Sequence, residues 1–100
     1  MIRTLRHKVN EGVQIKGNGR VIDVIVRELT GTPGLERALL EIHGVDGMER
    51  VDFGKSDGPV KLAHGLKIVV RTNNHGGNGV RIGYIRYASY ALEQKVYEQI

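Results

Sequence analysis

The chain has 100 residues, of which 40% are hydrophobic and 26% are charged, and its formal net charge is +4. These values are those of an ordinary folded chain, and the length suits a single domain spanning residues 1–100. The absence of cysteine excludes disulfides and thiolate metal sites. The segment 1–10 has no apolar run typical of a secretory signal, and no stretch is long and apolar enough to span a membrane, so we expect a cytoplasmic protein without membrane contact.

The first part of the chain has the rhythm of strands and turns. Met1–Val9 predicts a first strand with interleaved basic residues, and Gly12–Ile15 predicts a short second strand. Lys16–Gly19 contains an Asn-Gly pair, which accepts the positive φ that tight hairpin turns require. The density of Val and Ile in Arg20–Leu29 then predicts a well-buried strand.

The middle of the chain allows two interpretations. In Leu35–Val45, the spacing of Leu35, Leu39 and Ile42 suits one face of a helix, whereas Ala38, Leu40 and Ile42 alternate as in a strand. We favour the strand, because Val45-Asp46-Gly47 would then turn the chain into Met48–Phe53 as a hairpin.

The last part of the chain combines strands with an expected helix. Val60–Arg71 alternates in its second half, the polar loop Thr72–Gly79 follows, and Val80–Tyr87 predicts another strand. Leu92, Val96 and Ile100 are four residues apart, which predicts a short amphipathic helix near the C-terminus. The expected fold is mainly β, a small twisted sheet or barrel of about 5–7 strands with this C-terminal helix.

Catalytic chemistry has little support in the sequence. Ser56 and Ser89 do not lie in a nucleophile elbow, and the four histidines show no metal-ligand spacing. The Gly-rich segment His75–Gly79 lacks the Lys-Ser/Thr ending of a P-loop and precedes a strand. We therefore expect a protein without catalytic residues, metal or cofactor.

The basic residues favour an anionic partner. They gather in the first strand (Arg3, Arg6, His7, Lys8), near the later strands (Arg71, Arg81, Arg86) and at Lys95. Four tyrosines, Tyr84, Tyr87, Tyr90 and Tyr97, lie in the last part of the chain. Basic charge combined with aromatic or apolar platforms is typical of proteins that bind single-stranded RNA.

Two segments resemble the carbon storage regulator (CsrA/RsmA) family of small translational regulators. Gly76–Tyr84, GGNGVRIGY, is similar to the family's "G-N-x-V-R-I-G" core, and Lys95–Ile100 resembles the start of its C-terminal helix. Leu66–Val70 and Tyr90–Leu92 stand where the flanking strands would be, and Leu5–Ile15 resembles the family's opening segment. Relative to the family, the chain holds a long insertion of roughly residues 20–60.

The resemblance implies an RNA-binding post-transcriptional regulator that recognises single-stranded, GGA-containing RNA. It also implies an intertwined homodimer, in which the first strand of one subunit lies beside the last strand of the other. The RNA surface would comprise the first and last strands and the central turn. Carried over by position, it contains Leu5, Arg6, His7, Lys8, His75, Gly76, Gly77, Asn78, Leu92 and Lys95.

Two other functions remain open at the level of sequence. The same β scaffold suits a non-catalytic protein-interaction or inhibitor module, with a protein partner bound through the insertion. Arg71, His75 and Arg81 would alternatively suit a small phosphorylated ligand.

Overall fold

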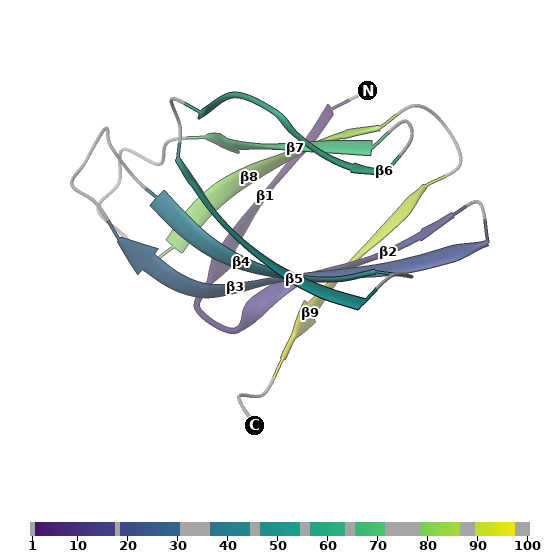
Figure 1. The fold of residues 1–100 in the computed structure, drawn as a ribbon, viewed down its shortest axis with the longest axis horizontal. Coiled ribbons are helices and arrows are strands. Elements are labelled where there is room, and N and C mark those ends of the chain that lie inside the picture. The colour runs from purple at the N-terminus through teal and green to yellow at the C-terminus, as the bar shows by residue number, and fades with distance from the viewer. Residues whose placement is uncertain are drawn as a thin grey trace.

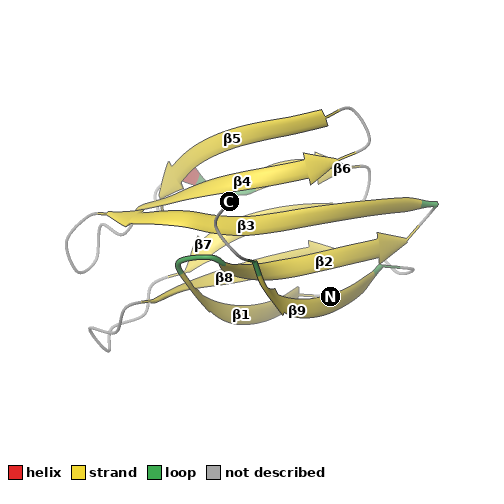
Figure 2. Ribbon diagram, turned by 90° about the horizontal axis from the view of Figure 1, so that it is seen from below, coloured by secondary structure: helices red, strands yellow, loops and turns green. Residues whose placement is uncertain are grey.

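The structure is a computed structural model that describes residues 2–17, 19–30, 37–44, 47–54, 57–63, 66–71, 79–86 and 90–97. These ranges contain nine strands arranged in two antiparallel sheets (Figure 1). The expectation of a mainly β protein is therefore confirmed. Figures 1 and 2 together show one sheet lying over the other. The buried side chains between the two sheets form the core.

The larger sheet, called sheet B here, has the strand order β5-β4-β3-β2-β9. Its strands are β2 (Glu11–Gly17), β3 (Arg20–Thr30), β4 (Arg37–Gly44), β5 (Gly47–Gly54) and β9 (Ala91–Val96). The smaller sheet, sheet A, has the order β1-β8-β7-β6. It consists of β1 (Ile2–Lys8), β6 (Val60–Ala63), β7 (Leu66–Arg71) and β8 (Gly79–Arg86).

Each sheet contains a meander of consecutive strands, bordered by a strand that belongs to the other half of the chain. In sheet B the meander β2-β3-β4-β5 is bordered by β9, the last strand of the chain, which pairs with β2. The meander β6-β7-β8 is followed by β1, the strand that precedes β2. The two halves of the chain thus exchange strands reciprocally, which ties the sheets together.

One hydrophobic core fills the space between the sheets. Leu5, Ile68 and Ile82 enter it from sheet A, and Val13 and Leu40 enter it from sheet B. Alternation explains the division, because successive residues of a strand face opposite sides. In β7, Leu66, Ile68 and Val70 are buried while Lys67 and Arg71 are exposed.

A tight corner at Asn10 carries the chain from β1 in sheet A to β2 in sheet B. Asn10 has a φ of 67°, a left-handed conformation that asparagine tolerates better than most residues. Its backbone N–H donates to the carbonyl of Val26, and its carbonyl accepts from the N–H of Tyr97. The Arg27 guanidinium also donates to the Asn10 side chain at 2.9 Å. These bonds fix the position of β1 relative to both β3 and the end of β9.

Both predicted hairpins of the first half are confirmed. Gly17 pairs with Arg20 across the first turn, where Gly19 has a φ of 72°. The ambiguous segment Leu35–Val45 contains strand β4, which pairs with β5 from Arg37↔Gly54 to Gly44↔Gly47. The turn residues Asn18, Val45 and Asp46 lie outside the described residues.

The expected C-terminal helix is wrong within the described residues, because Ala91–Val96 is strand β9 and pairs with β2. A spacing of four residues places Leu92 and Val96 on one face of a helix, but it also places them on one face of a strand. The pairing of Leu92 with Ile15 shows that the strand interpretation holds. Residues 98–100 lie outside the described part of the chain.

The expected number of strands was too low. Val60–Arg71, read as one segment, is two strands, β6 and β7, which pair with each other. The insertion predicted at roughly residues 20–60 supplies β3, β4 and β5, so it forms most of sheet B. The first strand, expected beside a second subunit, pairs with β8 of its own chain, from Ile2↔Ile85 to Lys8↔Gly79.

Candidate nucleic-acid interface

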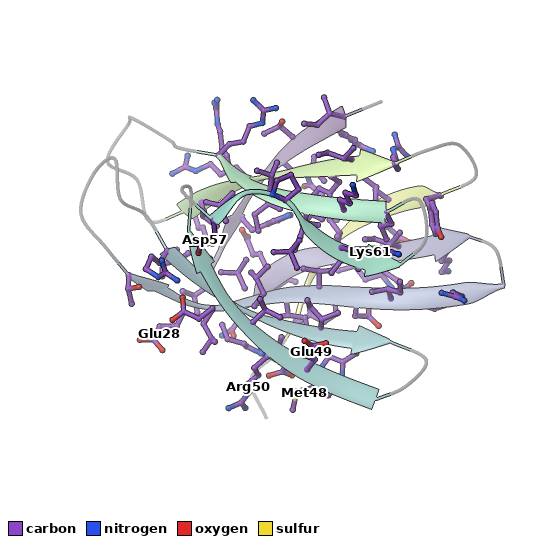
Figure 3. The ribbon with its side chains drawn as sticks, turned by 45° about the horizontal axis from the view of Figure 1, so that its top comes forward. Glu28, Met48, Glu49, Arg50, Asp57 and Lys61 are labelled. Carbon is purple, nitrogen blue, oxygen red and sulfur yellow. The ribbon has the colours of Figure 1, made fainter. Side chains whose placement is uncertain are left out.

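Charge is divided unequally between the two sheets. The strands of sheet A contain no Asp or Glu, and their charged residues are Arg3, Arg6, Lys8, Lys61, Lys67, Arg71, Arg81 and Arg86. The strands of sheet B carry both signs. Figure 3 shows this contrast at two neighbouring positions of β5, Glu49 and Arg50, whereas the labelled charge on β6 is Lys61. The charged residues on the strands of sheet A are therefore all cationic.

Three arginines form a row across this surface. Arg6 lies opposite Arg81, and Arg81 lies opposite Arg71, in the registers of β1, β8 and β7. All three side chains are exposed, and none forms an ion pair with another described residue. Like charges directly opposite each other on neighbouring strands destabilise a sheet. The row thus has an energetic cost that an anionic partner would remove.

Several charges of sheet B instead form ion pairs with one another. Glu41 accepts hydrogen bonds from Arg27 and lies 2.6 Å from Nε2 of His43, with Arg50 3.8 Å away. The hydrogen bond with His43 lowers the pKa of Glu41, although burial acts in the opposite direction. Arg37 pairs with Asp52 and Asp57. The strands of sheet B thus combine both signs of charge, partly in ion pairs, whereas the charged residues of the sheet A strands are all positive.

A hollow of about 220 Å³ lies where the edge of β1 approaches β9. Three of its lining residues were predicted from the sequence as RNA contacts: Arg6, His7 and Lys95. The others are Glu11, Gly12, Gln94 and Val96. The structure thus brings the first and last strands together within one chain, and Arg6 belongs both to this hollow and to the arginine row.

Two predicted surface residues of the first strand point inward instead. Leu5 is 8% exposed and His7 is 2% exposed, so the expectation that they lie on the surface is wrong. The alternation of β1 explains this, because Leu5 and His7 share one face of the strand and that face covers the core. Arg6 and Lys8, on the other face, are exposed as expected.

His7 is held in the core by Tyr84. Its Nε2 shares a hydrogen bond of 2.8 Å with the Tyr84 hydroxyl, and the two rings meet edge to face. Burial lowers the pKa of His7 to about 4, although the nearby Glu11 carboxylate acts in the opposite direction. Near neutral pH the imidazole is uncharged, so His7 adds no positive charge to the surface.

The other residues predicted to contact RNA either pack against the core or lie outside the described residues. Leu92 is half-buried and packs against the core, opposite Ile15. His75, Gly76, Gly77 and Asn78 lie outside the described residues. The predicted set omitted Arg71, Arg81, Lys61 and Lys67. The alternation of β7 contained a signal for two of them, since Ile68 and Val70 had to face the core and Lys67 and Arg71 the solvent.

The described ranges contain neither a cluster of metal ligands nor a membrane-spanning helix. No group of three or more His, Asp or Glu side chains there is arranged to hold a metal ion. Nor does that part of the chain contain a helix long and apolar enough to cross a membrane. A search of protein-family models, curated proteins and solved structures finds no match to the chain.

Proposed function

We propose that this protein binds RNA on the outer face of sheet A and acts as a post-transcriptional regulator. The observation that carries the proposal is the row Arg6–Arg81–Arg71 on a sheet whose strands contain no acidic residue. Exposed guanidinium groups bind phosphate oxygens through charge-assisted hydrogen bonds. Release of counterions from the nucleic acid adds a favourable, salt-dependent contribution.

The position of the row supports an extended ligand. Neighbouring strands are about 4.8 Å apart, so three adjacent arginines place positive charge over about 10 Å across the sheet. Lys67 and Lys61, which are also paired across strands, extend the positive charge to β6. This arrangement matches a polyanion better than a single phosphate group.

The resemblance of the sequence to the carbon storage regulator family supports RNA rather than DNA as the ligand, and a regulatory role in translation. It also suggests GGA-containing single strands as the first sequences to test. In this protein the proposed surface is centred on β1, β8 and β7, with Lys95 of β9 beside it at the hollow.

The test is a salt titration of RNA affinity with variants that remove charge from the row. Fluorescence anisotropy with a GGA-containing single strand should give weaker binding for Arg71→Gln/Arg81→Gln than for the natural chain. If each arginine contacts one phosphate, the slope of log affinity against log salt should become shallower by about 1.4.

Arg50→Gln is the matched control, because Arg50 is an exposed arginine on sheet B, 3.8 Å from Glu41. It should leave both affinity and slope nearly unchanged. Removing like-charge repulsion should not lower the melting temperature of the double variant, so unfolding would not explain its loss of binding. No RNA binding by the natural chain, or equal binding by the double variant, would refute the proposal.

A further inference from the structure

Two glycines of β8 lie directly beneath arginine side chains of the neighbouring strands. A Cβ atom placed on Gly79 would come 2.8 Å from Nε and 3.3 Å from Cγ of Arg6. The Arg6 side chain therefore extends along the sheet over the glycine instead of standing away from the surface. Any larger residue at position 79 would displace it.

Gly83 has the same relationship with Arg71. A Cβ atom there would lie 3.3 Å from Nε of Arg71, 3.0 Å from Cγ1 of Val69 and 3.2 Å from Cδ1 of Ile2. Gly83 is accordingly buried although its position in β8 faces outward, opposite Thr4 and Val69. The inner ends of two guanidinium groups are thus held against the sheet.

The outward positions of sheet A offer no aromatic ring to a nucleic-acid base. The aromatic side chains of its described strands are His7 and Tyr84, and both are buried in the core. RNA-binding sheets usually stack unpaired bases on aromatic side chains or on arginine guanidinium planes. Among the described residues on this face, only the arginines can fill that role.

We infer that Arg6 and Arg71, held against the sheet over Gly79 and Gly83, stack on unpaired bases and make this face selective for single-stranded over duplex RNA. The inference rests on the proposed RNA binding and deepens it. A duplex keeps its bases stacked on each other, so it offers the arginines phosphates alone. A single strand offers both phosphates and base faces, which adds affinity that depends on the planar guanidinium and not only on charge.

Charge-conserving substitution separates the contribution of positive charge to the affinity from the contribution of base stacking. Arg6→Lys/Arg71→Lys keeps the net charge but removes both guanidinium planes. Stacking contributes about 1–3 kcal/mol per base in single-strand binders. For a single-stranded RNA of about 12 nucleotides, within the usual site sizes, the double variant should bind about tenfold more weakly or worse. Its affinity for a duplex of the same sequence and its salt slope should stay close to those of the natural chain.

A second variant changes the position of Arg6 without altering any charge. Gly79→Ala places a methyl group where the Arg6 side chain now lies, so affinity for the single strand should fall several-fold and affinity for the duplex should not. Gly44→Ala is the control, because a Cβ atom at Gly44 meets nothing within 4 Å. Melting temperatures identify any variant that fails to fold.

The outcomes distinguish this inference from the function on which it rests. Absence of RNA binding by the natural chain overturns both. Binding that is lost in Arg71→Gln/Arg81→Gln but retained for the single strand in Arg6→Lys/Arg71→Lys overturns the stacking inference alone. Equal affinity of the natural chain for single strand and duplex also overturns it.

Discussion

Nε2 of His7 and the hydroxyl oxygen of Tyr84 lie 2.8 Å apart in the core, joining the two ends of the chain across β1 and β8. Both groups are buried, so each depends on the other to satisfy its hydrogen-bonding capacity. The hydrogen bond allows these two polar side chains to lie in a core that otherwise consists of aliphatic residues and Tyr90.

Removal of both partners should therefore cost less stability than the two single removals added together. Tyr84→Phe leaves the His7 imidazole unpaired, and His7→Phe leaves the Tyr84 hydroxyl unpaired, each at about 1–3 kcal/mol. The double variant His7→Phe/Tyr84→Phe should be destabilised by clearly less than the sum. Urea denaturation of the four proteins measures this coupling, and strictly additive losses would contradict it.

The protonation of His7 predicts loss of stability in mild acid. Its pKa is about 4 in the folded chain and near 6.5 when unfolded, so below pH 6.5 the unfolded state binds a proton that the folded state does not. The free energy of unfolding should fall as the pH drops from about 6.5 to about 4. At about 1.4 kcal/mol per pH unit, the full loss from this residue is about 3 kcal/mol.

The double variant His7→Phe/Tyr84→Phe provides the control for this pH dependence. It lacks the titrating imidazole but keeps all carboxylates, so its stability should decline less over the same pH range. Chemical denaturation at several pH values compares the two proteins. Parallel curves would show that His7 makes no such contribution.

Gly12 should tolerate no side chain. A Cβ atom there would lie 1.8 Å from the carbonyl oxygen of Val24, a backbone atom fixed by the pairing of β2 with β3. Gly12→Ala should destabilise the protein by about 3 kcal/mol or more, because the strands must separate to admit the methyl group. Thermal melting tests this against Gly44→Ala, which should change stability by less than about 1 kcal/mol.

Arg27 should matter more for stability than the neighbouring Arg50. Arg27 donates to both Glu41 and the Asn10 side chain, and its own side chain is 20% exposed. Arg27→Met removes these bonds and leaves Glu41 less well neutralised in a mostly buried position, at about 1–3 kcal/mol.

Arg50→Met is the matched substitution for that comparison. Arg50 is 63% exposed and lies 3.8 Å from Glu41, so its loss should cost no more than about 0.5 kcal/mol. Denaturant midpoints of the two variants measure the difference. Equal losses would show that the buried position of Arg27 gives no advantage.

The sequence predicts the local structure of this protein better than its long-range pairing. The Gly17–Gly19 turn and the buried β3 follow from backbone preference and β-branched density, which act over neighbouring residues. The end of the chain was predicted incorrectly, because the spacing of Leu92 and Val96 fits both a helix and a strand. Only the pairing of β9 with β2 distinguishes them, and that pairing joins opposite ends of the sequence.

For the candidate interface too, the sequence predicts local features better than long-range alignment. Arg6 and Lys8 were identified from local charge, and their exposure follows from the alternation of β1. The alignment of Arg6 with Arg81 and Arg71 depends on registers between strands far apart in the chain, which no local pattern specifies. His7 was assigned to the surface, together with Leu5, by its position in the resemblance to the carbon storage regulator family, although both residues lie on the buried face of β1.

The reciprocal exchange of strands between the two halves has a consequence for the order of folding. The meander β2-β3-β4-β5 can pair as soon as its own residues are present, but β1 must wait for β8 and β2 must wait for β9. His7 is 77 positions from Tyr84. Loop closure over such a distance costs entropy before it gains contacts, so the protein should fold on the slow timescale of milliseconds to seconds typical of non-local β-sheets. The edge of sheet A that carries Arg6 would then be among the last parts to assemble. The protein would therefore bind RNA only once the whole fold is complete.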